Sequence, residues 1–295
     1  MAEPVSEPLQ TTPMRVAESN ASPRFELPAR SCDAHFHVFE PGYPHVAKIQ
    51  YTFPDGTLDQ YLRVAEYLGI ERMVLVQPSY YGIDNRLTID VLRKVGSSCR
   101  GVVQIDDDIS DAELDDYHEA GVRSIRLDLF SRAGLATSDI EDYIRLMGKR
   151  TAARGWHLQF YTPGRIVRDL LPFLADFDET FVVDHMGYMK ETDGLTPADQ
   201  DHLIDAFEQN DNFWIKLSGA YRIAQDKPLS TVEALGRRLV AARPDRLCWG
   251  SDWPHLPDGQ RDTGVYLNLL ADWAPDADDR HKILVDSADQ LFFTT

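Results

Sequence analysis

Residues 31–38, Ser-Cys-Asp-Ala-His-Phe-His-Val, form a short run that is typical of a β-strand and carries two histidines one residue apart. Side chains two positions apart on a strand point to the same face, so His35 and His37 are expected to lie side by side. Two converging imidazoles can begin a metal site or a polar catalytic site. Such a pair can equally lie at the surface or in a hydrogen-bonded core, so a functional role depends on whether other segments supply partners for it.

From this run onward, short apolar runs alternate with segments of helical periodicity. The apolar runs predict eight strands, at residues 31–38, 72–77, 101–105, 122–127, 156–161, 181–185, 213–217 and 246–249. The segments between and after them predict helices, at residues 58–68, 84–95, 111–120, 139–154, 166–177, 197 onward, 231–242, 263–273 and 277–291. Eight strand-helix units in about 250 residues predict a (β/α)₈ TIM barrel. An open doubly wound sheet is the alternative, but no Gly-x-Gly-x-x-Gly follows a strand.

Composition is that of an ordinary globular chain, with 295 residues of which 43% are hydrophobic and 26% charged. No apolar run predicts a membrane helix, and no basic segment followed by an apolar core predicts a secretion signal. The three cysteines, Cys32, Cys99 and Cys248, are widely spaced, which argues against a disulfide framework and favours the cytoplasm. A formal net charge of −18 disfavours nucleic acid and anionic membranes as partners, whereas a small anion needs only a local group of arginines.

The N-terminal 27 residues differ from the rest of the chain. They are rich in Pro, Ser, Glu and Thr and have little apolar periodicity, which predicts an extended or disordered arm. Packing of this arm onto a neighbouring subunit is the alternative. Residues 28–295 are then expected to form one barrel domain, as a monomer or a small homo-oligomer.

Polar side chains gather where the apolar runs stop. In a barrel of this kind the active site lies at the C-terminal ends of the strands. The polar residues at these predicted ends are His35, His37, Gln77, Ser79, Arg126, Arg132, Tyr161, His185, Arg222 and Asp252. Chance would scatter such residues to both ends of the strands, so this distribution predicts an active site.

Three of these segments carry a resemblance to a known family. They are His35-Phe36-His37, Val183-Asp184-His185-Met186-Gly187 and Trp249-Gly250-Ser251-Asp252-Trp253-Pro254-His255. They resemble the amidohydrolase superfamily, and in particular the amidohydrolase-related branch that contains 2-pyrone-4,6-dicarboxylate lactonases and sugar lactonases. The resemblance runs from about residue 30 to the end, and residues 75–78, 82–86, 121–126 and 131–132 fit the pyrone-dicarboxylate enzymes. Residues 286–288, Asp-Ser-Ala, stand where relatives often carry Asn-Pro or Asn-Ala, which concerns a helix start.

The catalytic candidates are Asp252, His35, His37 and His185. A carboxylate among histidines just beyond a strand can take a proton from water, and the histidines can stabilise an oxyanion. The structural alternatives are an N-cap or a loop turn for Asp252 and hydrogen-bonded core positions for the histidines. The same four residues could instead hold one divalent ion, with Zn²⁺ as the expected metal.

The metal content is open between one ion and none. Two-metal members of the superfamily use a Lys or Glu from strand four and a His from strand five, where this chain is read as Leu127-Asp128 and Phe160-Tyr161. A two-metal site is therefore not expected. Pyrone-dicarboxylate lactonases are thought to work without a metal, and other lactonases of the branch hold one zinc. The arginines favour the former, so a metal-free reaction is predicted.

Arg126, Arg132 and Arg222 are the candidates for binding substrate carboxylates, because a guanidinium binds a carboxylate in a bidentate fork. Ordinary surface ion pairs are their alternative role. Tyr161, Ser79 and Gln77 are further candidates for the substrate side of the site. Together these residues predict a hydrolase that opens a carboxylate-bearing lactone, similar to 2-pyrone-4,6-dicarboxylate, by attack of water activated by Asp252. A metal-dependent decarboxylase and a sugar-lactone hydrolase or isomerase of the same branch are the alternatives.

Overall fold

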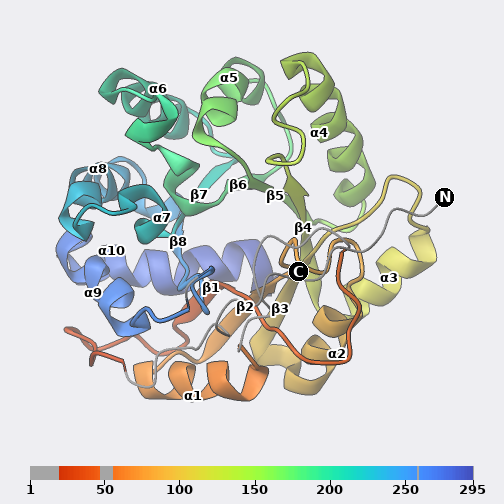
Figure 1. The fold of residues 1–295 in the computed structure, drawn as a ribbon, viewed down its shortest axis with the longest axis horizontal. Coiled ribbons are helices and arrows are strands. Elements are labelled where there is room, and N and C mark those ends of the chain that lie inside the picture. Colours follow the sequence, from red (N-terminus) through yellow and green to blue (C-terminus); the bar gives the residue numbers. More distant parts are fainter. Residues whose placement is uncertain (1–19, 47–55, 258, 295) are drawn as a thin grey trace, which may run out of the picture.

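The structure is a computed structural model that describes residues 20–46, 56–257 and 259–294. Its centre is one sheet of eight parallel strands, in which each strand pairs with the next along the chain (Figure 1). The strands are β1 (Cys32–Phe36), β2 (Arg72–Val76), β3 (Cys99–Val103), β4 (Val122–Asp128), β5 (His157–Tyr161), β6 (Phe181–Val183), β7 (Phe213–Leu217) and β8 (Leu247–Trp249). A parallel bridge between Phe36 and Trp253 joins β1 to the segment after β8. The predicted (β/α)₈ barrel is thereby confirmed.

The helices surround this barrel (Figure 1). They are α1 (Leu58–Leu68), α2 (Arg86–Val95), α3 (Asp111–Ala120), α4 (Thr137–Ala152), α5 (Gly164–Leu174), α6 (Pro197–Gln209), α7 (Ala220–Ala224), α8 (Glu233–Ala242), α9 (Thr263–Trp273) and α10 (Ala277–His281). None of the helices in the described ranges is long and apolar enough to cross a membrane.

Local sequence signals explain where several helices begin and end. Thr57 caps α1 in a capping box with Gln60, and Gly69 ends it at φ 79°, a conformation that favours glycine. Thr196 caps α6 in the same way, with Pro197 at the first helical position. Short helix α7 was not predicted, because its five residues are too few to show a helical period.

Several predicted strands differ from the observed ones by one or two residues at an end; the run 101–105, for example, is observed as the strand Cys99–Val103. The runs 31–38 and 181–185 end as strands at Phe36 and Val183. After β6 the backbone turns sharply, since His185 and Met186 have φ values of 52° and 53°. Left-handed backbone of this kind is costly for residues with a Cβ and is typically held where function needs it. The turn places the ring of His185 at the mouth of the barrel.

The two ends of the barrel interior differ in polarity. At the N-terminal end, Leu291 and Phe292 of the last chain segment pack with buried residues near the starts of the strands, among them Val74, Trp214 and Cys248. This segment continues α10 with i→i+5 hydrogen bonding over Lys282–Asp286 and Asp289–Phe293. The barrel therefore has a largely apolar floor, and the predicted catalytic residues lie at the opposite, C-terminal end.

Part of the N-terminal segment packs on α9. The Ala21 amide donates to both carboxylate oxygens of Asp262 at 2.9 Å, and the Arg24 amide donates to Asn268 at 2.7 Å. Gly264 is needed here, because a Cβ at that position would lie 2.0 Å from the Ala21 carbonyl oxygen. Residues 20–27 of the predicted arm thus contact the barrel of their own chain, whereas residues 1–19 lie outside the described residues.

Candidate active site

Four buried side chains from three different parts of the chain converge at the C-terminal end of the barrel. The Nε2 atoms of His35 and His37 are 3.3 Å apart. Asp252 Oδ1 lies 3.8 Å from Nε2 of His35, 3.6 Å from that of His37 and 3.9 Å from that of His185. All four residues are at most 3% exposed, so bulk water does not screen their interactions.

Asp252 is held in place through its backbone and through its second carboxylate oxygen. Its amide donates to the His35 carbonyl at 2.8 Å, and its φ is 59°. The Tyr221 hydroxyl donates to Oδ2 at 2.7 Å, and Arg222 Nε donates to the same oxygen at 2.6 Å. Oδ1 accepts a longer hydrogen bond from Arg222 Nη2 at 3.3 Å and is the oxygen that faces the histidines. Burial alone would raise the pKa of Asp252, but Arg222 and the neighbouring histidines hold it well below its usual range.

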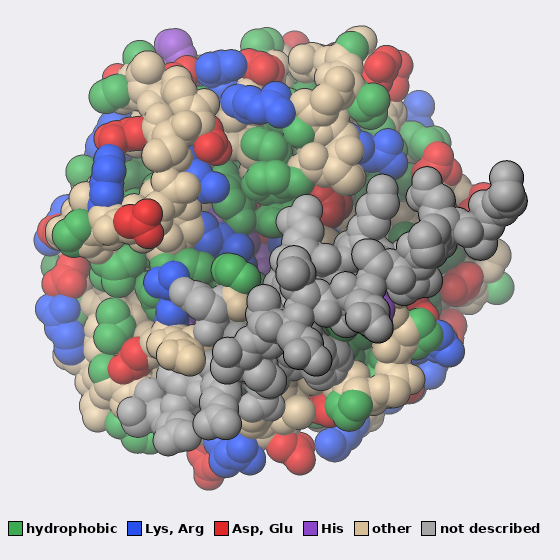
Figure 2. Space-filling model, in the orientation of Figure 1, with side chains coloured by type: hydrophobic (Ala, Val, Ile, Leu, Met, Phe, Trp, Pro, Cys, Tyr) green, Lys and Arg blue, Asp and Glu red, His purple; other side chains and the backbone are tan. Residues whose placement is uncertain are grey.

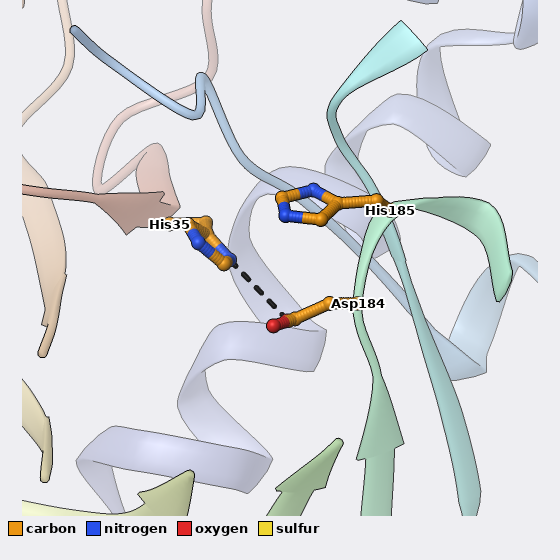
Figure 3. Close-up of side chains that lie close together, drawn as sticks. All are labelled: His35, Asp184 and His185. Atoms are coloured by element: carbon orange, nitrogen blue, oxygen red, sulfur yellow. Dashed lines mark ion pairs between the residues drawn. The ribbon is translucent and has the colours of Figure 1, made fainter. Parts of the chain in front are cut away.

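The three imidazoles are oriented by partners at their Nδ1 atoms. His37 Nδ1 lies 2.7 Å from the Val76 carbonyl, and His185 Nδ1 lies 2.9 Å from the Ser218 hydroxyl. His35 Nδ1 faces Asp184 at 3.3 Å, as Figure 3 shows. Each Nε2 consequently points toward the shared centre. Burial lowers the pKa of all three rings, that of His185 to about 3, so the rings are neutral near pH 7.

Beneath the histidines lies a buried polar network centred on Asp184. Its Oδ2 accepts from Gln159 at 3.2 Å and from Arg126 at 3.3 Å, and its Oδ1 lies 3.9 Å from Lys216 Nζ. Lys216 Nζ also donates to Gln159 Oε1 and to the Ala34 carbonyl, both at 2.7 Å. Burial alone would raise the pKa of Asp184, but His35, Lys216 and Arg126 lower it well below its usual range.

Sequence reasoning did not give this network a role, although one signal was available. Lys216 interrupts the otherwise apolar strand Phe213–Leu217 and is fully buried. A buried lysine needs a charged or hydrogen-bonding partner, so such an interruption indicates an interior polar network.

A family comparison agrees with this arrangement. The sequence model described as Amidohydrolase matches residues 32–294, which is most of the chain. The chain belongs to the amidohydrolase family. It is 34% identical over 286 residues to 2-pyrone-4,6-dicarboxylate hydrolase of Comamonas testosteroni, which covers 92% of this chain and 93% of that one. It is 35% identical over 275 residues to 4-sulfomuconolactone hydrolase of Rhizobium radiobacter, with 91% of each chain covered.

Solved structures show the same fold. An apo crystal structure of an Agrobacterium tumefaciens protein superposes with a TM-score of 0.79 at 26% sequence identity. The superposition covers 93% of this chain and 97% of the other. The arrangement of strands and helices around the site is thus shared with an experimentally determined structure.

The residues of this amidohydrolase fit one divalent ion. His35, His37 and Asp252 each offer a ligand atom to one shared space, and His185 adds an Nε2 that has no hydrogen-bond partner among the described residues. If His37 donates from Nδ1 to the Val76 carbonyl, its neutral ring turns a lone pair toward His35 Nε2. An Nε2–H tautomer of His35 would donate to this lone pair, whereas a His35 ring that keeps its proton on Nδ1, facing Asp184, would need a cation between the two lone pairs. Distances of 3.3–3.9 Å between the donor atoms match ligands placed about 2.0–2.2 Å from zinc.

The residues of β4 and β5 that face the barrel interior are not the ones that the sequence predicted. Arg126 of β4 pairs in register with Gln159 of β5, and these two side chains, which both contact Asp184, face the barrel interior. The sequence placed Leu127-Asp128 and Phe160-Tyr161 there, because the strand ends could not be fixed to one residue. Neither Arg nor Gln is the Lys, Glu or His that the two-metal relatives use at these positions, so the expectation against a two-metal site is unchanged.

Of the three arginines predicted to bind the substrate, two reach the candidate site and one lies away from it. Arg222 and Arg126 contact the site carboxylates, and Tyr161 stacks under the Arg126 guanidinium at 4.2 Å. Arg132 instead stacks on Tyr143 of α4 at 3.7 Å. The three predicted arginines therefore do not all meet at the catalytic cluster.

Ser79 and Gln77 lie in the loop after β2. The Ser79 hydroxyl donates to Asp128 at 2.7 Å. Gln77 is fully buried, donates to the carbonyls of Gly82 and Asp84, and accepts from Thr88. The side chain of Gln77 thus braces its own loop. Roles in substrate binding remain predictions for both residues.

A pH-dependent stability is expected from Asp33, which is buried below the active site. Its Oδ1 accepts the amides of His35 and Ser251, and burial raises its pKa from 3.8 to about 6. The folded protein thus binds a proton more tightly than the unfolded chain, so this group's stabilising contribution is present below pH 4 and is lost as the pH rises through 6.

The variant Asp33→Asn removes this titration and keeps one acceptor oxygen. From pH 4 to pH 7, the free energy of unfolding of the wild type should fall by about 2 kcal/mol relative to the variant. Urea unfolding of both proteins across this range measures the difference. A difference that stays constant with pH would contradict the assignment.

Proposed function

We propose that this amidohydrolase hydrolyses a lactone that carries anionic groups, similar to 2-pyrone-4,6-dicarboxylate. The observation that carries the proposal is Asp252, whose Oδ1 faces three imidazole Nε2 atoms, while Tyr221 holds its Oδ2 and Arg222 donates to both carboxylate oxygens, more closely to Oδ2. A base fixed beside oxyanion stabilisers is what acyl transfer to water requires. The names of the two lactone-hydrolysing relatives support the substrate class.

In the proposed reaction, Asp252 Oδ1 takes a proton from water as the water oxygen attacks the lactone carbonyl carbon. The carbonyl oxygen gains negative charge and accepts a hydrogen bond from His185 Nε2–H. This tautomer, with the proton on Nε2, is favoured when the Ser218 hydroxyl donates a hydrogen bond to His185 Nδ1, which lies 2.9 Å away. The ring C–O bond then breaks, and Asp252 returns its proton to the leaving oxygen. The products are an enol or hydroxyl group and a carboxylic acid, which ionises to a carboxylate by releasing the second proton of the attacking water to solvent.

His35 and His37 lie beside the same carbonyl as neutral rings. With its proton on Nε2, His35 would donate to the Nε2 lone pair of His37 across their 3.3 Å contact, which fixes both rings beside Asp252 Oδ1. A metal-free reaction remains the prediction. Were a divalent ion bound by His35, His37, His185 and Asp252, it would supply Lewis-acid polarisation of the carbonyl.

Hydrolysis in ¹⁸O-labelled water is the test of this function. The product of a single turnover should carry one labelled oxygen in the new carboxylate, because that oxygen comes from the attacking water. Mass spectrometry of the product measures it. Conversion of the lactone without label would instead support isomerisation, in which an internal hydroxyl takes the place of water.

The second candidate, a metal-dependent decarboxylase, is favoured by one observation, the cluster of donor atoms described above. It requires a tightly held divalent ion. Elemental analysis of the purified protein separates the candidates. A stoichiometric metal, together with release of carbon dioxide that stops on chelation, would favour decarboxylation. Lactone opening that survives chelation would favour the proposed hydrolase.

A further inference from the structure

A pocket of about 300 Å³ lies directly beside the catalytic cluster. Tyr188 and Tyr221 belong to its lining and also contact the cluster. The Tyr221 hydroxyl donates to Asp252 at 2.7 Å, and the ring of Tyr188 lies 5.2 Å from that of His185. A substrate whose carbonyl is at His185 therefore extends into this pocket.

The pocket is cationic in a strongly acidic protein. Lys190, Arg222 and Arg261 line it, and none of its lining residues in the described ranges is acidic. The chain as a whole carries a net charge of −18, which repels anions at long range. On the face in Figure 2, Lys and Arg side chains border the hollow near the centre, next to hydrophobic side chains. Such a local reversal of charge indicates a site for an anionic group.

Two of these cations lie over aromatic rings of the pocket. Arg222 is engaged with Asp252, whereas Lys190 Nζ lies 4.9 Å from the centre of the Tyr188 ring and the Arg261 guanidinium lies 4.5 Å from that of Tyr221. Both cations thus rest on aromatic rings that line the pocket, which limits the number of positions they can take. Burial lowers the pKa of Lys190, so its ammonium group would gain from an anion beside it.

A neutral donor adjoins them. Gln225 also lines the pocket, and its Oε1 accepts from the Thr192 hydroxyl at 2.8 Å. Because this contact uses the amide oxygen, the amide nitrogen of Gln225 is the atom that could donate to an anion bound in the pocket. Two cations and one amide are a suitable set of donors for the oxygens of a carboxylate or a sulfonate.

We propose that Lys190, Arg261 and Gln225 form a second anion subsite, which binds a carboxylate or sulfonate of the lactone remote from the carbonyl under attack. The inference rests on the proposed function, because it assigns one end of the substrate to the catalytic cluster. It also assigns the remote anion to residues outside the motifs that identify the family. Arg132, which stacks on Tyr143, has no part in this subsite.

Lys190→Met tests the proposal, since it removes the charge and keeps the apolar stem. For 2-pyrone-4,6-dicarboxylate, kcat/KM should fall about 10- to 100-fold, the effect of losing one charge-assisted hydrogen bond. The monocarboxylates 2-pyrone-4-carboxylate and 2-pyrone-6-carboxylate each keep one of the two carboxylates. For the one that lacks the remote carboxylate, Lys190→Met should change kcat/KM by less than about twofold. Equal loss for all three lactones, or no loss, would overturn the proposal.

Matched variants control for general effects. Lys190→Arg keeps the charge and should keep most of the activity. Lys227→Met removes an exposed lysine that pairs with Glu191 at 2.7 Å and does not line the pocket, so it should leave kcat/KM unchanged. Thermal unfolding confirms that each variant folds. Arg261→Met is the second variant, and it should reproduce the selective loss if Lys190→Met does not fold.

Binding of unreactive probes separates the subsite from the reaction. By calorimetry, the wild type should bind benzene-1,3-dicarboxylate or 3-sulfobenzoate more tightly than benzoate, and the preferred probe identifies the anion as carboxylate or sulfonate. Lys190→Met should abolish the preference. If Lys190→Met abolishes this preference but the wild type hydrolyses no lactone, the proposed function is wrong and the subsite is supported. If lactones are hydrolysed but the wild type shows no preference, or the variant keeps it, the subsite is wrong.

Discussion

Replacing Asp252 with asparagine is expected to lower kcat for lactone hydrolysis by about 10²- to 10⁴-fold, the range that a positioned general base contributes. Asparagine has the same shape and can still accept from Tyr221 and Arg222, but it cannot take a proton from water. Binding of the substrate should therefore change much less than turnover. Single-turnover kinetics and calorimetry with the hydrolysis product measure the two effects separately.

The control for this variant is Asp211→Asn. Asp211 precedes β7, at the N-terminal end of the barrel, where it pairs with Arg243 at 3.0 Å. Its replacement should leave kcat unchanged. A variant of Asp252 that folds and turns over the substrate at a rate close to the wild type would exclude the proposed role of this carboxylate.

Replacing Asp184 with asparagine is expected to lower the free energy of unfolding by about 3–5 kcal/mol, because it leaves Lys216 and Arg126 buried without their counter-charge. The activity should fall as well, since His35 loses the carboxylate that faces its Nδ1 at 3.3 Å. Chemical denaturation of the full-length protein measures the loss of stability, and kcat measured well below the unfolding midpoint shows the effect on catalysis.

A double-mutant cycle distinguishes a specific charge pair from a general loss of packing. Lys216→Met in the Asp184→Asn background should cost less than in the wild type, with a coupling energy of about 1–3 kcal/mol. The exposed pair Lys282 and Asp279, 2.9 Å apart, is the matched control and should show much weaker coupling. Additive effects at Asp184 and Lys216 would contradict a shared network.

Sequence periodicity was sufficient for the fold because each strand of a parallel barrel is buried on both sides and each helix on one. The alternation of apolar runs and amphipathic segments therefore remained visible along the whole chain. The strand ends were less certain, since hydrogen bonding across strands decides them. That uncertainty placed Leu127 and Phe160 where Arg126 and Gln159 face the interior.

The candidate site was accessible to sequence reasoning only where residues follow strands directly. His35, His185 and Asp252 follow or end strands, and the geometry of the barrel brings such positions together. Side chains farther along the loops were not accessible, because a loop residue takes the direction that its tertiary partner allows. Arg132 illustrates this, since the ring of Tyr143 on α4 holds its guanidinium.

The apolar floor formed by Leu291 and Phe292 has a consequence for how this enzyme could diversify. This packing lies at one end of the barrel, and the residues proposed to choose the substrate lie at the other. Mutations in the loops after the strands can therefore accumulate without weakening the packing at the floor. A library randomised at Lys190, Gln225 and Arg261 should accordingly retain folded members with altered anion preference, which makes this chain a suitable parent for directed evolution.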